Sequence, residues 1–432
     1  MNIRKLALDM IIDYEISGKY VNLSLSSHTA DKLTDSERGQ LTSLLYTAVE
    51  HKITYDYLIA ALSGRSIQDI DGYTRALLRL GLCQIIHINS IPDFAATNET
   101  VKLARNQGER SFVNGVLRSA VRNKDSLPIP NKEKNYSRYL SVKYSFPLWI
   151  VKHFSSLFGE EQCERILDFY NTEKYTDISV NLTKCDGLAF REKYSAKPVI
   201  DNGISLRIDS SRNPERLEGF SNGDFFVQDT ASATAVAALA PRAGDRLIDV
   251  CAAPGGKSFA AAVLMENKGE IYSFDLHESK LSLIESGAKR LGLDIINVDV
   301  GDATAPVENL LGTADKVICD VPCSGLGVLG KKPDLRYKDE AGVKELPALQ
   351  LKILTESSKY LKEGGELLYS TCTLNPDENE NTVKAFLEEN KGFELVDFGL
   401  GELCSLGGML TLLPHIHKTD GFFMAKLKRK SK

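Results

Sequence analysis

The chain has 432 residues, enough for two or three domains, and its content of 43% hydrophobic and 26% charged residues is ordinary for a globular protein with a sizeable core. The formal net charge of −5 excludes a global basic field. Any binding of nucleic acid must therefore use local basic patches.

Eight cysteines are scattered along the chain without a Cys-x-x-Cys pair. This distribution favours a reducing cytoplasm and argues against a disulfide framework, a zinc module or another metal site. The first residues lead into an amphipathic helix pattern rather than a signal peptide, and no apolar stretch approaches the ~20 residues that span a membrane. We expect a cytoplasmic protein with no membrane or metal partner, and no feature demands more than a monomer.

Residues 1–130 are predicted to form an all-helical domain. Apolar residues recur with a 3.6-residue period from Ile3 to Tyr14, and Asp35 or Ser36 is suited to cap a second helix. Further helical patterns cover 71–88, 94–107 and 110–123. The proline-containing segment 126–132 is typical of a linker.

Residues 136–225 have a different pattern, which predicts a small α+β linking module. A helix is expected near 147–170, and short strands are expected at 177–182, 204–208 and 224–228.

Strand and helix patterns alternate in residues 226–432, which predicts a third domain with a mostly parallel, doubly wound sheet. Ligands of such sheets bind outside the carboxyl ends of the strands. The expected strands are Arg246–Val250, Glu270–Asp275, Ile295–Val298, Lys316–Asp320, Glu366–Ser370 and Phe422–Leu427.

A glycine-rich turn follows the first of these strands, and Gly255 and Gly256 let the backbone approach a ligand closely. Asp275 ends the next strand, where a carboxylate suits a ribose diol, and Asp302 follows the third strand, where it could accept a hydrogen bond from an adenine amino group. A tight turn with ordinary capping acids is the alternative. The turn departs from Gly-x-Gly-x-x-Gly, which weakens an NAD interpretation. The candidate cofactor residues are Cys251, Ala252, Ala253, Pro254, Gly255, Gly256, Lys257, Asp275 and Asp302.

Two cysteines lie in polar loops at strand ends, Cys323 in Asp-Val-Pro-Cys-Ser-Gly and Cys372 in Tyr-Ser-Thr-Cys-Thr. A single cysteine is usually a small buried hydrophobe, as we expect for Cys83, Cys163 and Cys319. Two thiols facing a cofactor edge instead indicate covalent catalysis, because the thiolate is a strong nucleophile near neutral pH. Asp320, just before the Pro-Cys pair, could hold a ring nitrogen of a base.

These motifs resemble those of the S-adenosylmethionine-dependent RNA cytosine-5 methyltransferases of the NOL1/NOP2/Sun group. Residues 226–229 (Phe-Val-Gln-Asp) resemble the motif that opens their catalytic domain. The helical front, with Phe-Val-Asn-Gly-Val-Leu at 112–117, is similar to the antitermination factor NusB. Because a NusB-like front joined to this catalytic domain is typical of bacterial 16S rRNA methyltransferases, the resemblance covers the whole chain and implies a Rossmann-like catalytic domain.

The resemblance implies a role for each candidate residue. Cys372 would attack carbon 6 of a cytosine, Cys323 would assist departure of the enzyme, and Asp320 would contact N3 of the ring and the cofactor. The glycine-rich turn, Asp275 and Asp302 would bind S-adenosylmethionine. Because DNA cytosine-5 methyltransferases use a Pro-Cys cysteine as nucleophile, the second thiol favours RNA.

A basic loop directly follows the Pro-Cys motif. Its cations suit phosphates and its aromatic ring suits stacking on a base drawn out of its stack, although a solvated charged face is the alternative. Arg118 and Arg122 on the front domain could form part of another RNA face. The loop departs from the family, which commonly has an Arg-His pair before Pro-Asp, and Val321 stands where the family commonly has Ala. The candidate RNA-binding residues are Lys331, Lys332, Arg336 and Tyr337.

The function predicted from these residues is methylation of carbon 5 of one cytosine in 16S rRNA. Two alternatives stay open at this point. One is the same chemistry on tRNA, and the other is a non-catalytic RNA-binding or ribosome-assembly factor. Retention of both thiols and all three aspartates argues against the second alternative, because a scaffold needs neither thiol.

Overall fold

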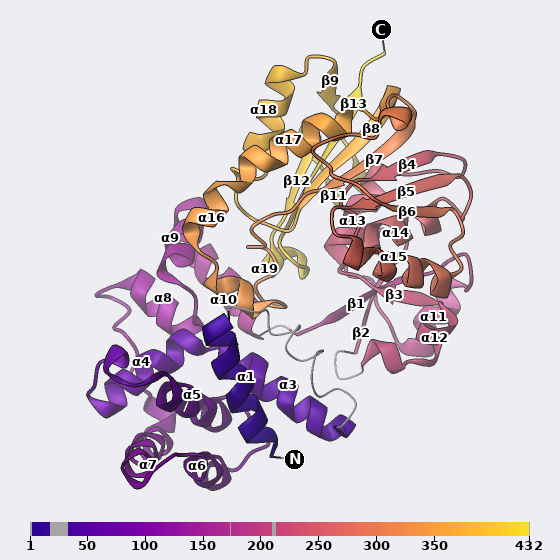
Figure 1. Ribbon diagram of the computed structural model, residues 1–432. Coiled ribbons are helices and arrows are strands. Elements are labelled where there is room, and N and C mark those ends of the chain that lie inside the picture. The colour runs from indigo at the N-terminus through magenta and orange to yellow at the C-terminus, as the bar shows by residue number, and fades with distance from the viewer. Residues whose placement is uncertain (1, 18–32, 173, 210–212, 432) are drawn as a thin grey trace. The chain divides into compact units, whose positions relative to one another are not determined.

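The computed structural model describes residues 2–17, 33–172, 174–209 and 213–431 (Figure 1). They form two compact units. Unit 1 comprises Met1–Asn171 and Lys332–Lys338, and unit 2 comprises Thr172–Lys331 and Asp339–Lys432. The boundary near residue 172 lies inside the predicted linking module 136–225, whose part before the boundary joins unit 1 and whose part after it, with all three strands, joins unit 2.

Unit 1 is helical, as predicted. Its central helix is α5, which is buried along most of its length and packs against α1, α3, α4, α6 and α7. The core is built from aliphatic residues of these helices, which recur at helical spacing. The helices are α1 (Ile3–Ser17), α3 (Asp35–Glu50), α4 (Lys52–Ser63), α5 (Gly72–Ile86), α6 (Asp93–Val101), α7 (Gln107–Arg122), α8 (Tyr136–Tyr144), α9 (Leu148–Phe158) and α10 (Glu160–Thr172), with short 3-10 turns η2 (Ile67–Asp69), η3 (Lys124–Ser126) and η6 (Pro333–Tyr337).

Two local predictions for unit 1 were wrong. Helix α3 is capped by Thr34, not by Asp35 or Ser36, because Thr34 and Glu37 form a reciprocal capping box. The single helix expected near 147–170 is two helices, α9 and α10, separated at Gly159. The φ angle of 82° at Gly159 lies outside the helical range and ends α9.

A small antiparallel sheet forms part of unit 2, close to the three predicted strands. Strand β1 (Thr176–Val180) lies between β2 (Ser205–Ile208) and β3 (Phe225–Val227). Its apolar face packs with helix α11 (Gly187–Tyr194) around Ile178 and Phe225. The 3-10 turn η4 (Pro214–Arg216) and helix α12 (Glu218–Asn222) precede β3.

The large sheet of unit 2 has the order β12-β13-β8-β7-β4-β5-β6, and β9 also pairs with β13. Neighbours from β8 to β6 are parallel, as the alternating pattern predicted, while the pairs β8–β13, β13–β12 and β13–β9 are antiparallel. The strands are β4 (Arg246–Asp249), β5 (Glu270–Asp275), β6 (Ile296–Val300), β7 (Ala314–Asp320), β8 (Leu361–Thr371), β9 (Phe393–Leu395), β12 (Met409–Leu412) and β13 (Phe422–Arg429).

Helices cover both faces of this sheet (Figure 1). Leu247 of β4 joins the core beneath α13 (Thr230–Leu239), α14 (Gly256–Leu264) and α15 (Glu278–Leu291). The next residue, Ile248, joins the opposite core with α17 (Leu346–Ser358) and α18 (Glu380–Glu389). This alternation buries both faces of the central strands and explains their continuous apolar sequences.

The strand order reverses direction at β4. From β4 the chain runs outward through β5 and β6, then returns to the other side of β4 with β7 and β8. The carboxyl ends of β4 and β7 therefore flank the topological switch point, where doubly wound sheets bind their ligands. The glycine-rich turn follows β4, and the Pro-Cys motif follows β7.

The remaining elements of unit 2 are short: η5 (Glu308–Leu310), α16 (Glu340–Lys344), β10 (Gly399–Leu400), β11 (Leu403–Cys404) and α19 (Pro414–His417). Within the described ranges, every helix is too short or too polar to cross a lipid bilayer. The same ranges contain no cluster of three or more His, Cys, Asp or Glu side chains that could hold a metal ion.

Candidate active site

The glycine-rich turn after β4 is held by its neighbours in unit 2. The Ala252 amide donates to the carbonyl of Phe274 (2.8 Å), and the Ala253 amide donates to Oδ2 of Asp275 (3.2 Å). Gly255 has a φ of 108° and lies so close to Phe259 that an added Cβ would be 2.3 Å from the ring. The turn therefore requires glycine at this position, where helix α14 begins with its amides facing the carboxyl edge of the sheet.

A glutamine of the Phe-Val-Gln-Asp segment fixes the other side of the turn. Gln228 donates from Nε2 to the carbonyl of Gly256 (2.9 Å) and accepts at Oε1 from Ser179 of β1 (2.7 Å). The small sheet thus supports the glycine-rich turn through one side chain. This contact gives a physical reason for a polar residue at the end of β3.

The two acids predicted to bind the cofactor occupy the ends of neighbouring strands. Asp275 is buried at the end of β5, where its Oδ1 accepts from the His277 amide (3.0 Å). Asp302 is exposed two residues beyond β6, and hydrogen bonds from the backbone and side chain of Thr304 lower the pKa of its carboxyl group. Asp275 touches the glycine-rich turn directly, whereas Asp302 belongs to the more distant strand end.

Asp249, the last residue of β4, is not among the cofactor residues predicted from the sequence. Its side chain is fully buried, and burial raises the pKa of its carboxyl group to about 7 although Ser258 donates to Oδ2 (2.7 Å). Its Oδ1 has no hydrogen bond of normal geometry within the described ranges. A buried acceptor beside a turn of small residues fits a ligand that brings a cationic or N–H group, as S-adenosylmethionine does. An acid at the end of a buried strand, directly before a glycine-rich turn, was the available signal.

Lys257 and Asp320 form an ion pair between the turn and the end of β7. The Lys257 Nζ lies 2.6 Å from Oδ2 of Asp320, and Ser370 of β8 donates to Oδ1 (2.7 Å). Burial opposes the charge of Lys257, but Asp320, with smaller contributions from Asp249 and Cys372, raises the pKa of Lys257. The predicted residues Lys257 and Asp320 are therefore brought together, with a positive charge held near Cys372.

The two predicted thiols are brought together at the ends of β7 and β8. The Sγ atoms of Cys323 and Cys372 are 3.0 Å apart, and both side chains are half-buried. The hydrogen bond with Cys372, together with burial and the negative charges of Glu378 and Asp320, raises the pKa of the Cys323 thiol. The raised pKa favours the protonated thiol form of Cys323 near neutral pH. By contrast, Cys83, Cys163 and Cys319 are fully buried, as expected.

Lys331, the first residue of the predicted basic loop, is held by ion pairs inside unit 2. Its Nζ contacts Oδ2 of Asp229 (2.5 Å) and Oδ2 of Asp420 (3.2 Å), and it lies over the ring of Tyr175. These carboxylates raise the pKa of Lys331 against the effect of burial. About a third of the side chain is exposed (35%), and two carboxylates already balance its charge within unit 2.

The prediction that Arg336 is an exposed RNA contact was wrong. Its side chain is fully buried in unit 1, where Nη2 contacts Oε1 of Glu50 (3.2 Å) and the guanidinium lies 4.0 Å from the ring centre of Phe146. The Tyr337 hydroxyl also points inward and donates to the carbonyl of Val49 (2.8 Å). Apolar neighbours and a buried carboxylate explain the difference, because a charge run on the sequence does not reveal which cations are paired. Lys332 is exposed, as are Arg118 and Arg122.

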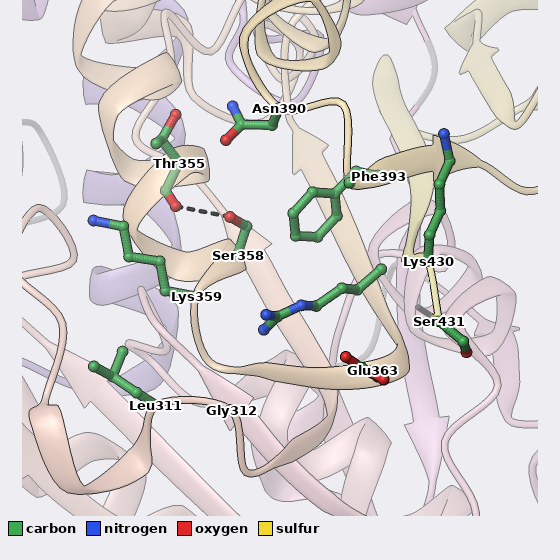
Figure 2. A pocket seen from close by; sticks show the side chains of 12 residues that line it. Leu311, Gly312, Thr355, Ser358, Lys359, Glu363, Asn390, Phe393, Lys430 and Ser431 are labelled. Atoms are coloured by element: carbon green, nitrogen blue, oxygen red, sulfur yellow. Dashed lines mark hydrogen bonds between the residues drawn. The ribbon is translucent and has the colours of Figure 1, made fainter.

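A separate pocket in unit 2 is lined by none of the predicted site residues. Figure 2 shows it between the end of α17 and the last residues of β13, with Lys359, Phe393 and Lys430 at its wall. It lies where β7 and β8 begin, which is the edge of the sheet opposite to the two thiols. This pocket is therefore distinct from the candidate active site.

The comparisons with known proteins agree with this geometry. Residues 236–428 match the family model described as 16S rRNA methyltransferase RsmB/F, and residues 1–122 match the NusB family. The 236–428 match covers the doubly wound sheet, its glycine-rich turn and the two thiols. Fold and match together define the class as an RNA methyltransferase domain.

Full-length relatives identify the family. The chain is 35% identical to a probable ribosomal RNA small subunit methyltransferase B of Bacillus subtilis and 29% identical to a ribosomal RNA small subunit methyltransferase B of Escherichia coli, with 99% of each chain covered. The crystal structure of PH0851 is similar over 99% of both chains, with 26% identity and a TM-score of 0.78. The chain belongs to the RsmB-type family of RNA methyltransferases, with a NusB region at its front. This confirms the family, the fold class and the enzyme class predicted from the sequence.

Proposed function

We propose that this enzyme methylates carbon 5 of one cytosine in small-subunit (16S) ribosomal RNA in the cytoplasm, with S-adenosylmethionine as methyl donor and Cys372 as nucleophile. The observation that carries the proposal is the pair of sulfur atoms 3.0 Å apart beside the cofactor turn. In this proposal Cys323 is a protonated thiol that assists release, and Cys372 is the thiolate that attacks the base. The names of the full-length relatives support the ribosomal substrate.

Carbon 5 of cytosine is a poor nucleophile and does not attack a methyl donor unaided. The reaction therefore needs a group on the enzyme that first adds to the ring. Addition of the Cys372 thiolate at carbon 6 forms a C–S bond and makes carbon 5 enamine-like. When bound, S-adenosylmethionine supplies an electrophilic methyl group. After carbon 5 has taken the methyl group, its proton passes to water and the electron pair of the C–S bond returns to Cys372 as a thiolate, which restores the aromatic ring. Cys323, adjacent to that bond, assists this release.

Asp320 is placed to manage charge on the base. Attack at carbon 6 sends electron density into the ring, where N3 takes up a proton from water, and we assign the Asp320 carboxylate to accept a hydrogen bond from the resulting N3–H. Ser370 and Lys257 fix its carboxylate from two sides, so it needs little reorganisation when the base enters. Residues 251–257, Asp275 and Asp302 are assigned to the cofactor.

The RNA surface is assigned to a smaller set than the sequence indicated. Lys332 is exposed, and Lys331 could exchange one of its two carboxylate partners for a phosphate. Arg336 and Tyr337 are not included, because their side chains are packed into unit 1. Arg118 and Arg122 on α7 supply a second candidate surface in the NusB region.

The first experiment incubates the protein with tritiated S-adenosylmethionine and, separately, 16S rRNA or bulk tRNA transcripts, followed by mapping of the labelled base. We expect label at carbon 5 of one cytosine of 16S rRNA. Label only in tRNA would retain the mechanism and replace the substrate. Binding of cofactor without label in free RNA or in small-subunit assembly intermediates would instead favour the non-catalytic factor.

Substitution of the cysteines tests their separate tasks. Cys372→Ser should reduce transfer by at least ~10³-fold while S-adenosylmethionine still binds, because the hydroxyl is a far weaker nucleophile. Cys323→Ala should accumulate a covalent RNA adduct that survives denaturing electrophoresis. Cys404→Ser, which changes an exposed cysteine of β11, is the matched control and should behave as wild type. Near wild-type turnover by Cys372→Ser would contradict the assignment.

A further inference from the structure

Glu378 is a buried carboxylate whose oxygens are surrounded by donors. Its side chain is fully buried in the segment between β8 and α18. Oε2 accepts from the Ser324 amide (2.7 Å) and from Nε2 of Gln350 (3.0 Å). Oε1 accepts from Nδ2 of Asn375 (3.1 Å) and from the hydroxyl of Thr373 (3.4 Å). Four neutral donors therefore stabilise the buried carboxylate.

The donors belong to the loops that carry the two thiols. Ser324 directly follows Cys323, and Thr373 directly follows Cys372. The hydroxyls of Ser324 and Thr373 also bond to one another (2.7 Å). Glu378 therefore connects the residue that follows one cysteine to the residue that follows the other.

Helix α17 adds a third support. Nε2 of Gln350 donates to Oε2 of Glu378 and also to the carbonyl of Pro322 (2.9 Å), the residue before Cys323. The Cys323 loop is thus held on both sides of the cysteine, by the Pro322 carbonyl and by the Ser324 amide. Both oxygens of Glu378 accept from donors, whereas a glutamine side chain has only one oxygen, so replacing Glu378 with glutamine would turn an NH₂ group toward two existing donors.

We propose that Glu378 is the positioning residue of the thiol pair: it sets the separation of Cys323 and Cys372 and keeps Cys323 protonated while Cys372 attacks. This inference rests on the proposed function. The negative charge of Glu378 acts in the required direction, because it is among the causes that raise the pKa of the Cys323 thiol.

The decisive test measures thiol reactivity in the absence of RNA. The full-length protein is treated with iodoacetamide, and modification of Cys323 and Cys372 is timed by mass spectrometry. In the wild type Cys372 should react faster. Glu378→Gln should reduce the ratio of the two rates by about tenfold, because one unit of pKa changes the thiolate fraction tenfold. Asp377→Asn, which alters the adjacent exposed carboxylate, should leave the ratio unchanged.

Kinetics supply the second measurement. Glu378→Gln should lower kcat by about 100-fold and change KM for RNA by less than about threefold, because it displaces reacting groups rather than the binding surface. If Glu378→Gln fails to fold, Gln350→Leu removes one donor to the same carboxylate and should shift the ratio in the same direction. A folded variant with the wild-type alkylation ratio would overturn the proposal.

The two measurements separate this inference from the proposed function. If the ratio changes in Glu378→Gln but the wild type methylates no cytosine, the control of the thiols by Glu378 stands and the substrate assignment fails. If the wild type methylates cytosine and the ratio is insensitive to Glu378, the function stands and Glu378 has no positioning role.

Discussion

Asp249 shows how strongly burial can act on one residue of the cofactor edge. It ends β4 with no exposed surface, and burial raises the pKa of its carboxyl group to about 7. At pH values between about 4, the ordinary pKa of the group, and about 7, the folded protein keeps a proton on Asp249 that the unfolded chain releases. Folding stability around β4 therefore falls as the pH rises through this window.

Asp249→Asn should remove that pH dependence. Relative to the wild type, the variant should gain local stability between pH 4 and pH 7, on the order of 1.4 kcal/mol for each unit of pKa shift. Hydrogen–deuterium exchange of peptides from β4 and α14, measured across this range, reports the opening free energy. Asp294→Asn, a change at an exposed position, is the control. Parallel pH profiles for wild type and Asp249→Asn would contradict the burial argument.

Among single residues, the sequence predicts those that stand in a recognisable motif. It does not reveal residues whose role depends on burial in the folded protein. Cys323 and Cys372 were found because each lies in a polar loop after an apolar strand, and Asp320 because it ends such a strand; the structure places all three at adjacent strand ends. Glu378 was missed because an acid in a turn resembles any other acid until four donors are seen around it. Arg336 was misassigned for the same reason, since its partner Glu50 is distant in sequence.

Among the elements, three loops meet at a pair of glycines next to the thiols. The Gly327 amide donates to the carbonyl of Cys372 (2.9 Å), and the Gly421 amide donates to the carbonyl of Gly327 (2.8 Å). A Cβ on Gly327 would lie 1.8 Å from the Gly421 oxygen. The loop after β7, the loop after β8 and the start of β13 are therefore fixed to one another by close backbone contact.

Gly327→Ala should disrupt the backbone contacts among these three segments. The clash is with backbone atoms, which cannot move without displacing Cys372, so we expect a loss of about 1–3 kcal/mol in stability and at least a tenfold loss of transfer. Thermal unfolding and methyl-transfer assays measure the two effects. Gly342→Ala is the matched control, because its Cβ would meet nothing within 4 Å. Wild-type behaviour of both variants would show that the loops are not packed as described.

The central parallel strands could be predicted to within a few residues, because each is an apolar run before a polar turn. The short strands β9, β10, β11 and β12 could not be, since two to four residues carry too little periodicity to separate them from loops. The short 3-10 turn η6 was expected as an exposed basic loop. Its Leu335 and Arg336 are buried instead, which a local charge pattern cannot reveal.

At the scale of the whole molecule, the two compact units do not follow one another simply along the chain. Residues 332–338 belong to unit 1 although the chain on both sides of them belongs to unit 2. The catalytic unit is thus interrupted directly after its Pro-Cys motif. Within unit 1, Arg336 anchors this segment through Glu50, the carbonyl of Tyr144 and the ring of Phe146.

Arg336→Ala should destabilise unit 1 by about 3–5 kcal/mol, because it leaves the buried Glu50 without its cation. Trp149 in α9 is the single tryptophan of the chain, so its fluorescence reports the unfolding of unit 1 alone. Lys332→Ala removes an exposed cation from the same segment and should leave this transition unchanged. The double variant Glu50→Met, Arg336→Met should recover most of the loss, because removing both charges removes the unpaired one. If Arg336→Ala unfolds like the wild type, the segment is not anchored by this side chain, and Arg336 becomes available again as an RNA contact.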